Sequence, residues 1–360
     1  MQHIHTDVFT VDPLHPDAAI IERAASLLRQ GEVVVFPTET VYGLGADAFQ
    51  PAALERIFAA KGRPYSDPLI VHIVDEESLS LLTPAIPLEA KLLAEAFWPG
   101  PLTMILPRGP RVPDLVTSGF PTVAVRMPRH PVAQALIRAT GSPIAAPSAN
   151  RFMHVSPTTA QHALGDLEGR VPLILDGGPS EVGVESTVLD LCSPVPTILR
   201  PGGVSLEALR TVLPNVQPPQ KRQAENQEAP VEVQTQAQRS PGQMLIHYAP
   251  AVPLLLFDGS EATMRAAMLA EARRRQARGE RVGVLIADED VPAFQGSGVR
   301  THSLGSAAAP EQIAASLFAC MRSLEAAGVQ VILCRSFDER GLGLAIRDRL
   351  LKAAGGKIWG

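Results

Sequence analysis

The stretch KGRPYSDPLIVHIV, residues 61–74, contains a change from helix to strand, and the fold prediction for the N-terminal part of the chain starts from it. The preceding residues PAALERIFAA (51–60) have a helical pattern, and Gly62 is a typical stop signal. A loop with two prolines follows, and PLIVHIV is a short apolar run typical of a buried strand. The stretch therefore predicts helix, polar loop and strand in succession, with Lys61 and Arg63 beside the loop.

Similar patterns continue on both sides of this stretch. Further strands are predicted at EVVVFP (32–37), LTMILP (102–107), TVAVRMP (122–128) and PIAAPS (143–148), and helices near 17–30, 51–60, 88–97 and 131–140. Because strands and helices do not alternate strictly here, we expect a mixed sheet with helices packed on it.

The last third of the chain is more regular. Strands at 252–257, 281–287 and 329–334 alternate with helices at 261–278, 311–327 and 341–354. Strict alternation predicts parallel strands joined by right-handed crossovers. The fold class is therefore α/β: an N-terminal mixed-sheet domain and a smaller C-terminal Rossmann-like domain with a parallel sheet.

The composition changes sharply between the two parts. Residues 214–241 contain seven glutamines, several prolines and no aromatic residue, which is typical of a linker. With 360 residues the chain is long enough for two cores. We expect domains at 1–213 and 251–360, joined by a linker at 214–250.

Charge and cysteine usage restrict the class of protein. A net charge of −5 argues against a surface devoted to nucleic acid, although a confined basic groove remains compatible with it. Three scattered cysteines fit neither a disulfide framework nor a zinc site. The N-terminus lacks a signal pattern and no apolar run reaches the length of a membrane span, so we expect a cytoplasmic protein without a membrane segment.

The sequence contains no convincing nucleotide-binding motif. The chain has no G-x-x-x-x-G-K-[ST] sequence. GLGADA (43–48) fits G-x-G-x-x-A formally, but the preceding strand ends well before Gly43 and the next helix begins near Pro51. A Gly-rich turn is therefore favoured over a dinucleotide-binding loop.

Lys61 and Arg63 allow two interpretations. They can cap the C-terminal dipole of the helix that precedes them. Alternatively, they can form an anion site with Ser148 and Asn150, which lie in the polar loop APSANRF after a strand. Four hydrogen-bond donors on two loops suit a phosphate or a ribose.

Arg126 and His72 both lie on predicted strands. Strand periodicity places Thr122, Ala124 and Arg126 on one face. An unpaired buried charge is costly, so either a distant acidic side chain or a ligand carboxylate should face Arg126. His72 is either a satisfied core histidine or part of a site.

Three further positions are weak signals by themselves. Ser156 and Pro157 have the residue types of a helix N-cap and first turn, whose N–H groups can also hold phosphate. Ser186 begins a predicted strand, and Arg200 precedes a Pro-Gly-Gly turn. Each of these residues can equally be structural.

Taken together, several segments resemble the threonylcarbamoyl-AMP synthase family in its long, two-domain form. These are PTETVYGLGADAF, KGRPYSDPLIVHI, FWPGPLTMIL, TVAVRMP, IAAPSAN, DGGPSEVGVESTVLDL, LRPGG and SPGQMLIHYAP. The resemblance covers about residues 10–213 closely, then the end of the linker, and the C-terminal part more loosely.

The resemblance implies a nucleotidyltransferase that makes threonylcarbamoyl-AMP and pyrophosphate from L-threonine, bicarbonate and ATP, with Mg²⁺ accompanying ATP. The product feeds tRNA N6-threonylcarbamoyladenosine formation through separate transfer proteins. The implied fold has a concave nucleotide and amino-acid site in the N-terminal domain, and no protein metal site is implied. A double-stranded-RNA-binding or ribosome-associated module, with RNA held on this partly basic surface, is the alternative.

The resemblance also implies roles for individual residues. Lys61 and Arg63 would be the catalytic cations. ATP contacts would come from Lys61, Arg63, Asp67, Thr122, Ser148, Asn150, Ser156, Arg200 and His247. The threonine pocket would be formed by Thr40, His72, Arg126, Ala146 and Ser186. No general base stands out. Independently of the resemblance, residues 240–250 are too apolar for a mere spacer. We expect them to close over the nucleotide as a lid, the alternative being that they only dock on the C-terminal domain before the strand at 252–257.

Overall fold

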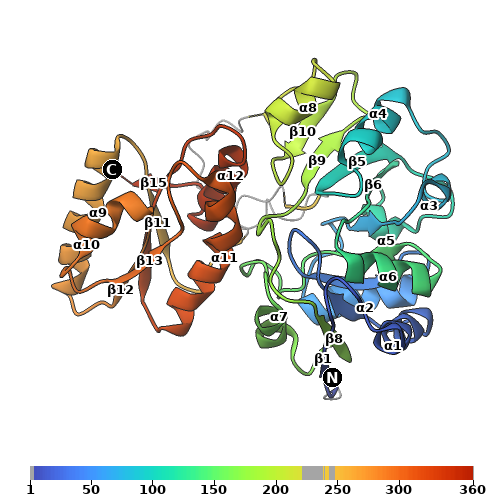
Figure 1. The fold of residues 1–360 in the computed structure, drawn as a ribbon, viewed down its shortest axis with the longest axis horizontal. Coiled ribbons are helices and arrows are strands. Elements are labelled where there is room, and N and C mark those ends of the chain that lie inside the picture. Colours follow the sequence, from blue (N-terminus) through green and yellow to red (C-terminus); the bar gives the residue numbers. More distant parts are fainter. Residues whose placement is uncertain (1–3, 221–237, 239, 243–247, 360) are drawn as a thin grey trace. The chain divides into compact units, whose positions relative to one another are not determined.

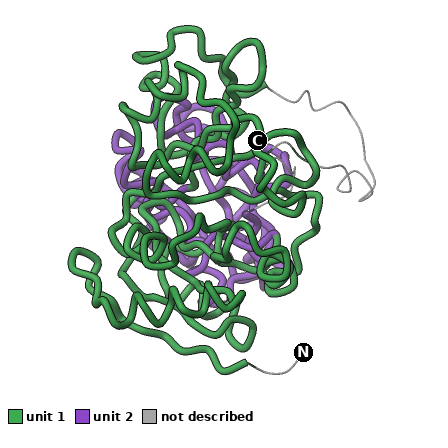
Figure 2. Tube along the Cα trace, turned by 90° about the vertical axis from the view of Figure 1, so that its right-hand side faces the viewer, with its two compact units in different colours: residues 1–152, 157–181, 185–243 green, residues 153–156, 182–184, 244–360 purple. Residues whose placement is uncertain are grey.

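The computed structural model describes residues 4–220, 238, 240–242 and 248–359 (Figure 1). These residues form two compact units, which Figure 2 shows in separate colours. The first unit comprises 1–152, 157–181 and 185–243, and the second comprises 153–156, 182–184 and 244–360. The second unit therefore includes two short loops from the N-terminal part of the chain, which the sequence did not predict.

The first unit is built on a mixed sheet, as predicted. Its strand order is β1-β8-β2-β3-β7-β4-β6-β5-β9-β10, with parallel and antiparallel neighbours. The strands are β1 (Asp7–Thr10), β2 (Val34–Phe36), β3 (Gly43–Asp47), β4 (Ile70–His72), β5 (Leu102–Pro107), β6 (Thr122–Arg126), β7 (Ile144–Ala145), β8 (Leu173–Asp176), β9 (Thr187–Asp190) and β10 (Thr197–Arg200).

The four predicted helices of this unit are present within one residue of their expected bounds, and α2 extends one residue further than predicted, to Lys61. The helices are α1 (Ala18–Arg29), α2 (Pro51–Lys61), α3 (Glu76–Ser80), α4 (Leu88–Phe97), α5 (Asp114–Thr117), α6 (Pro131–Thr140), α7 (Ala160–Leu167) and α8 (Leu206–Val212). The shorter helices α3 and α5 were not predicted, because one turn of chain carries too little periodicity.

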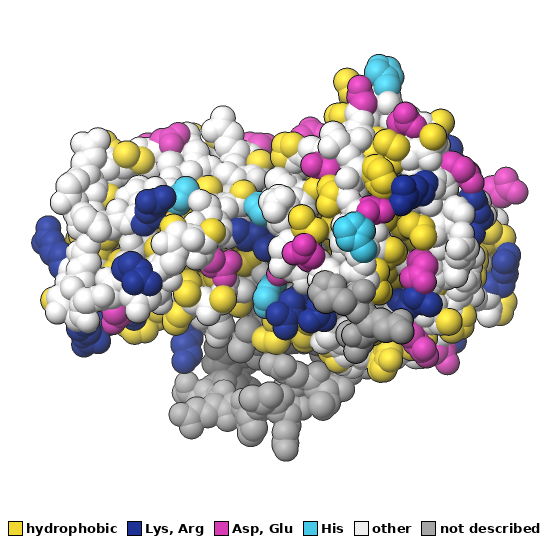
Figure 3. Space-filling model, turned by 90° about the horizontal axis from the view of Figure 1, so that it is seen from below, with side chains coloured by type: hydrophobic (Ala, Val, Ile, Leu, Met, Phe, Trp, Pro, Cys, Tyr) yellow, Lys and Arg dark blue, Asp and Glu magenta, His cyan; other side chains and the backbone are white. Residues whose placement is uncertain are grey.

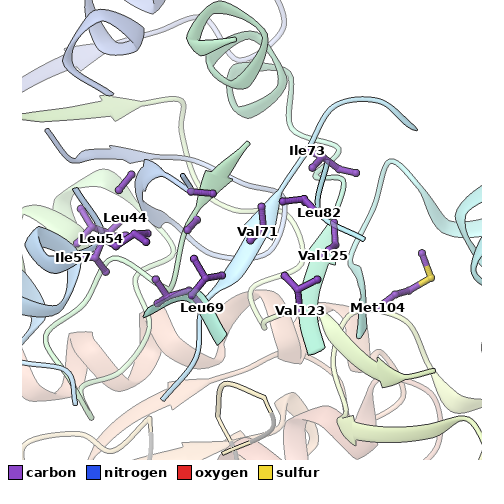
Figure 4. Packing of buried hydrophobic residues seen from close by; sticks show 14 of the residues in the cluster. Leu44, Leu54, Ile57, Leu69, Val71, Ile73, Leu82, Met104, Val123 and Val125 are labelled. Carbon is purple, nitrogen blue, oxygen red and sulfur yellow. The ribbon is translucent and has the colours of Figure 1, made fainter. Parts of the chain in front are cut away.

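The large sheet has a different core on each face. On one face, alternate strand residues such as Leu44, Val71 and Val125 pack with Leu54 and Ile57 of α2 (Figure 4). On the other face, α1 and α6 cover β2, β7 and β8. Over β4, β5, β6 and β9 this second face carries a small apolar cluster and a group of polar side chains.

The prediction of a turn at GLGADA was wrong. Gly43–Asp47 is strand β3, which is fully buried between β2 and β7. A Cβ atom at Gly45 would lie 2.7 Å from Ile144 Cγ2 and 2.8 Å from the Phe36 ring. Close packing against neighbouring side chains, not a phosphate turn, therefore accounts for this glycine.

The helix start predicted at Ser156 was also wrong. Helix α7 begins at Ala160, and its N-cap is Thr159, whose hydroxyl accepts a hydrogen bond from the His162 N–H. Pro157 lies outside the helix instead, and its carbonyl accepts a hydrogen bond from Tyr42 N at 2.9 Å. Tertiary pairing thus overrides a local capping signal here.

The second unit has the expected parallel sheet, in the order β13-β12-β14-β11-β15. Its elements are β11 (Leu254–Phe257), α9 (Glu261–Gln276), β12 (Val282–Ile286), a 3₁₀ turn (Asp288–Asp290), α10 (Val291–Phe294), β13 (Arg300–Ser303), α11 (Pro310–Ala326), β14 (Val331–Arg335), α12 (Gly343–Ala353) and β15 (Ile358–Trp359). The edge strands β13 and β15 were not predicted, since one is polar and the other has two residues.

The two short loops join the second unit through close backbone contacts. Gly183, with φ +75°, packs on α11, where a Cβ atom would lie 2.3 Å from the carbonyl oxygen of Ala314. Ala249 N donates to the carbonyl of Met153 at 3.0 Å. Glycine at 183 is therefore required both by conformation and by space.

The described ends of the predicted linker are packed. Val216 belongs to the core of the first unit, and Gln217 pairs with Thr197 of β10. Tyr248 is buried in the second unit, where its ring centroid lies 5.8 Å from that of Phe318 and the Arg349 guanidinium stacks on it at 4.8 Å. Both ends of the linker are thus anchored to a unit.

Candidate functional site

A row of residues crosses five strands of the first unit's sheet. Ile144 of β7, His72 of β4, Arg126 of β6, Thr103 of β5 and Val188 of β9 are successive register partners. They lie on the face opposite the core of Leu44, Val71 and Val125. Strand alternation therefore presents an imidazole, a guanidinium and a hydroxyl side by side, as predicted for Arg126.

Arg126 is buried and held by three groups. Its Nη1 donates to Thr40 Oγ1 at 2.8 Å, and its Nε donates to the Gly100 carbonyl at 3.2 Å. Its Nη2 lies 2.6 Å from Glu39 Oε1 in an ion pair whose side chains are 4% and 2% exposed. Of the two partners considered from the sequence, the distant acidic side chain is thus present.

The loop before β3 supplies both Glu39 and Thr40. Thr38 Oγ1 lies 2.8 Å from Thr40 Oγ1 and donates to the Val41 carbonyl at 2.6 Å. Because the Thr38 proton is used in that bond, the Thr40 hydroxyl donates to Thr38 and accepts from Arg126. The loop is therefore rigidly tied to the guanidinium.

His72 is buried beside Arg126. Burial, followed by the neighbouring positive charge of Arg126, lowers the pKa of His72 to about 3. Its Nδ1 lies 3.2 Å from the Ile70 carbonyl, and its ring meets that of Phe36 edge to face. The imidazole is therefore neutral near pH 7 and adds a polar, uncharged group to the row.

Ser186 connects the row to Arg200. Its Oγ lies 2.7 Å from Thr103 Oγ1, and Arg200 Nη2 donates to Ser186 Oγ at 3.1 Å and to the Ser186 carbonyl at 3.0 Å. Arg200 Nη1 also reaches the carbonyl of Pro241, at 3.4 Å. Arg200 thus links the strand face to a described part of the linker.

Lys61 is the last residue of α2 and is 3% exposed. Its Nζ donates to the carbonyls of Ser148 and Asn150, at 2.5 Å each. These bonds use two of its three N–H groups and leave the third for a ligand. Burial, and then the charge of Arg63, lowers the pKa of Lys61 well below its ordinary value.

Lys61 lies in the last turn of α2, where its charge is compatible with the helix-capping role, and its contacts also reach a second segment. Both acceptors belong to the loop after β7, more than 80 positions away. The same loop is fixed by two further bonds, from Leu44 N to the Pro147 carbonyl at 2.9 Å and from Ala149 N to the Tyr42 carbonyl at 2.8 Å. The structure therefore brings Lys61, Ser148 and Asn150 together, as the anion-site hypothesis requires.

Arg63 and Asp67 form a second buried ion pair, with Nη2 3.0 Å from Oδ2. Arg63 Nη2 also donates to the Pro68 carbonyl at 2.6 Å, and its Nε donates to the Asp67 carbonyl at 3.1 Å. Burial raises the pKa of the Asp67 carboxyl, and the charges of Arg63 and Lys61 oppose that rise. The pair shapes the loop that carries both predicted cations.

The remaining candidates lie at different places. Ala146 is buried just after β7, and its N–H donates at 2.9 Å to the carbonyl of Ile70, two residues before His72. Thr122 lies half-buried at the far end of β6 from Arg126. Ser156 is buried and groups with the second unit. His247 lies outside the described residues.

Two functional candidates were missed from the sequence, Glu39 and Thr103. Glu39 lies in the quoted segment PTETVYG, where an acidic residue between two threonines in an otherwise apolar stretch was the available signal. Thr103 shares the strand face of Arg126 through register alone. Both residues lie far from Arg126 in the sequence, so no local pattern around Arg126 indicates them.

The described residues contain no group of three or more His, Cys, Asp or Glu side chains that could hold a metal ion. Among the same residues, no helix is long and apolar enough to cross a membrane. On the face drawn in Figure 3, Lys and Arg side chains lie scattered among Asp and Glu. That face gives no support to a continuous basic surface for RNA.

The fold and the site define an α/β protein with buried cations and hydroxyls gathered on one sheet face and its loops, which is the arrangement of an enzyme for an anionic substrate. A family model described as "Telomere recombination" (Sua5_yciO_yrdC) matches residues 26–202. A second model, "Threonylcarbamoyl-AMP synthase, C-terminal domain", matches residues 204–355.

Proteins similar to this chain match it over nearly its whole length. The threonylcarbamoyl-AMP synthase of Bacillus subtilis is 45% identical over 352 residues, covering 98% of this chain and 97% of its own. That of Pyrococcus abyssi is 41% identical, covering 94% and 95%. A crystal structure of P. abyssi Sua5 complexed with L-threonine superposes with a TM-score of 0.89 at 39% identity, covering 98% of each chain. The chain belongs to the threonylcarbamoyl-AMP synthase family.

Proposed function

We propose that this chain makes L-threonylcarbamoyl-AMP and pyrophosphate from L-threonine, bicarbonate and ATP. The observation that carries the proposal is the match to enzymes of this name over both units and the linker. The structure of the P. abyssi relative with L-threonine supports the amino-acid substrate. The comparisons do not favour the alternative of an RNA-binding or ribosome-associated module.

The amino-acid pocket is proposed on the row that crosses β4, β6 and β5. Arg126 would bind the substrate carboxylate, and Thr40, His72, Ser186 and the backbone at Ala146 would surround it. The hydrogen bonds from Thr40 to Arg126 and from Arg200 to Ser186 support a preorganised pocket. A neutral His72 suits this place, because it can bind the threonine hydroxyl without adding charge.

The nucleotide site is proposed on the loops beside this row. The contact between Lys61 and the loop of Ser148 and Asn150 supports a phosphate site there. The proposed ATP-binding residues are Lys61, Arg63, Asp67, Thr122, Ser148, Asn150, Ser156, Arg200 and His247.

The chemistry requires positioning and charge neutralisation more than a protein nucleophile. The threonine amine combines with bicarbonate to give a carbamate and water. A carbamate oxygen then attacks the α-phosphorus of ATP, the bond to the β-phosphate oxygen breaks, and pyrophosphate leaves. Lys61, Arg63 and Arg200 would neutralise the charge that develops on the phosphates.

Mg²⁺ is proposed to enter as part of the ATP complex. This ion commonly keeps several waters and is held by substrate phosphates with one or two carboxylates. The carboxylates of Asp67 and Glu39 are already paired with arginines. Binding through the phosphates is therefore the arrangement that these residues support best.

Roles for the segments follow from the same proposal. Residues 1–213 would be the catalytic domain and 251–360 a supporting domain, with 240–250 acting as a lid over the nucleotide. The contacts from Gln238 N to the Ser66 carbonyl and from Arg200 to Pro241 support docking of the linker beside the site. The product would pass to separate proteins that modify tRNA in the cytoplasm, with at most weak direct RNA contact.

The test is a single reaction. Purified protein is incubated with ATP, L-threonine and ¹³C-bicarbonate, and the products are followed by mass spectrometry and a pyrophosphate assay. Labelled threonylcarbamoyl-AMP and an equal amount of pyrophosphate are expected. Pyrophosphate release that does not depend on threonine would overturn the proposal.

A further inference from the structure

The ion pair of Glu39 and Arg126 has unused hydrogen-bonding capacity although it is buried. Apart from the 2.6 Å contact between Arg126 Nη2 and Glu39 Oε1, no described residue forms a hydrogen bond of ordinary geometry with either oxygen of Glu39 or with that nitrogen. Buried polar atoms in folded proteins are nearly always hydrogen-bonded. Such atoms on both members of one pair therefore call for an explanation, and a bound ligand that completes their bonding provides one.

We propose that Glu39 is a substrate-binding residue, whose carboxylate accepts the α-ammonium group of the amino acid while Arg126 binds its α-carboxylate. This inference rests on the proposed function, because it adds a residue to the amino-acid pocket. We call this pair of residues, Glu39 and Arg126, the clamp.

The geometry of the pair matches an amino-acid zwitterion. The two charged groups of the substrate are attached to one carbon atom, and Glu39 Oε1 and Arg126 Nη2 lie 2.6 Å apart. A guanidinium has five N–H groups, and the bonds to Thr40 and Gly100 use two of them. Both terminal nitrogens thus keep N–H groups for the two oxygens of a carboxylate.

The charges also balance. An ionised carboxylate accepts hydrogen bonds at roughly four positions and an ammonium group donates three. Burial acts to raise the pKa of Glu39, but the ion pair with Arg126 is the main opposing influence, and the pKa is lowered overall. Glu39 is therefore negative near pH 7, and a neutral zwitterion meets a neutral pair without leaving a net buried charge.

A purely structural role makes a different prediction. If Glu39 only orients Arg126, its loss weakens every ligand that Arg126 holds by the same factor. If Glu39 binds the ammonium group, its loss weakens only ligands that carry that group. Two analogues separate these cases: (3R)-3-hydroxybutanoate lacks the amine of threonine, and L-threoninamide keeps the amine but lacks the carboxylate charge.

The experiment measures binding of L-threonine and both analogues to the wild-type protein and Glu39→Gln, by calorimetry and, for weak ligands, by ligand-observed NMR. Glu32→Gln is the matched control, because it removes a half-buried glutamate that pairs with Arg56 at 2.6 Å elsewhere in the first unit. Glu39→Gln should weaken L-threonine and L-threoninamide by about 10- to 100-fold. Its affinity for 3-hydroxybutanoate should stay the same or rise.

The possible results are distinct. Equal weakening of L-threonine and 3-hydroxybutanoate, or unchanged threonine binding, would overturn the role of Glu39. Failure of the wild-type protein to bind L-threonine would instead overturn the proposed function. A crystal structure of the wild-type complex tests the clamp without any variant: the amine nitrogen should lie within about 3.2 Å of a Glu39 oxygen, and a nitrogen that contacts other groups only would contradict it.

Discussion

Lys61 and Ser148 are joined by a 2.5 Å hydrogen bond between a side-chain ammonium and a backbone carbonyl, although 87 positions separate them in the chain. The bond places the end of helix α2 against the loop that follows β7. Because a carbonyl holds the lysine without cancelling its charge, Lys61 stays available to an anion. This contact determines which effects are expected when Lys61 is replaced.

Lys61→Met should lower product formation by about 100-fold or more, because the charge that develops on the phosphates loses a buried cation. The measurement is kcat/KM for pyrophosphate release. Lys91→Met is the control, because it removes an exposed lysine of α4 in the same unit. Near-normal turnover in Lys61→Met would leave Lys61 only the structural role of holding the loop.

ATP binding should take up protons at alkaline pH. The pKa of Lys61 is lowered by burial, so above that pKa the free protein carries a neutral amine. Bound triphosphate favours the charged form of Lys61 and raises its pKa, so binding takes up a proton. ATP affinity should therefore fall as the pH rises through the lowered pKa of Lys61 in the free protein. Calorimetry in buffers of different ionisation enthalpy measures this uptake, which Lys61→Met should abolish. The same uptake in that variant would assign it to another group.

Arg126→Ala should weaken L-threonine binding by about 2–4 kcal/mol and leave ATP binding nearly unchanged, because it removes the carboxylate-binding group alone. The same change leaves Glu39 buried without its counter-charge, which should lower the free energy of unfolding by about 3–5 kcal/mol. Adding Glu39→Gln should restore part of that stability without restoring threonine binding. An equal loss of affinity for both ligands would show that Arg126 is only structural.

His72 should remain neutral down to about pH 4, since burial and Arg126 lower its pKa to about 3. An unfolded chain protonates the same residue near pH 6.5, so the stability contributed by a neutral His72 is present above that pH and is lost as pH falls towards 3. Nitrogen chemical shifts of the imidazole, followed by NMR against pH, measure the titration. A midpoint between pH 5 and 7 would contradict the buried environment.

Replacing residues 243–248 by Gly and Ser should reduce product formation sharply and release ATP or the intermediate to hydrolysis, if 240–250 acts as a lid. Tyr248 is the described anchor of this segment, through its contacts with Phe318 and Arg349. Tyr248→Phe is the milder control, since it keeps the stacked ring. Unchanged synthesis with no added hydrolysis would rule out the lid.

The sequence alone was sufficient for features that depend on short stretches of chain. Helix α4 and helix α6 lie within their predicted bounds, because apolar periodicity and Pro or Gly at the ends act within a few residues. Alternation along β6 correctly placed Thr122, Ala124 and Arg126 on one face. The motifs were also sufficient for the family, which the comparisons confirmed.

Only the tertiary structure decided which residues meet. The same local signals favoured a turn at GLGADA and a helix cap at Ser156, and both were overridden by pairing with distant segments. The partner of Arg126 lies on a loop joined to it by sheet register, so no local pattern contains the Glu39 contact. Secondary structure depends on hydrogen bonds and sterics between residues that are close in sequence. A buried charge requires a counter-charge, and the order of the strands decides which distant residue supplies it. The sequence thus determined the elements and the family, and the packing of the sheet determined the composition of the site.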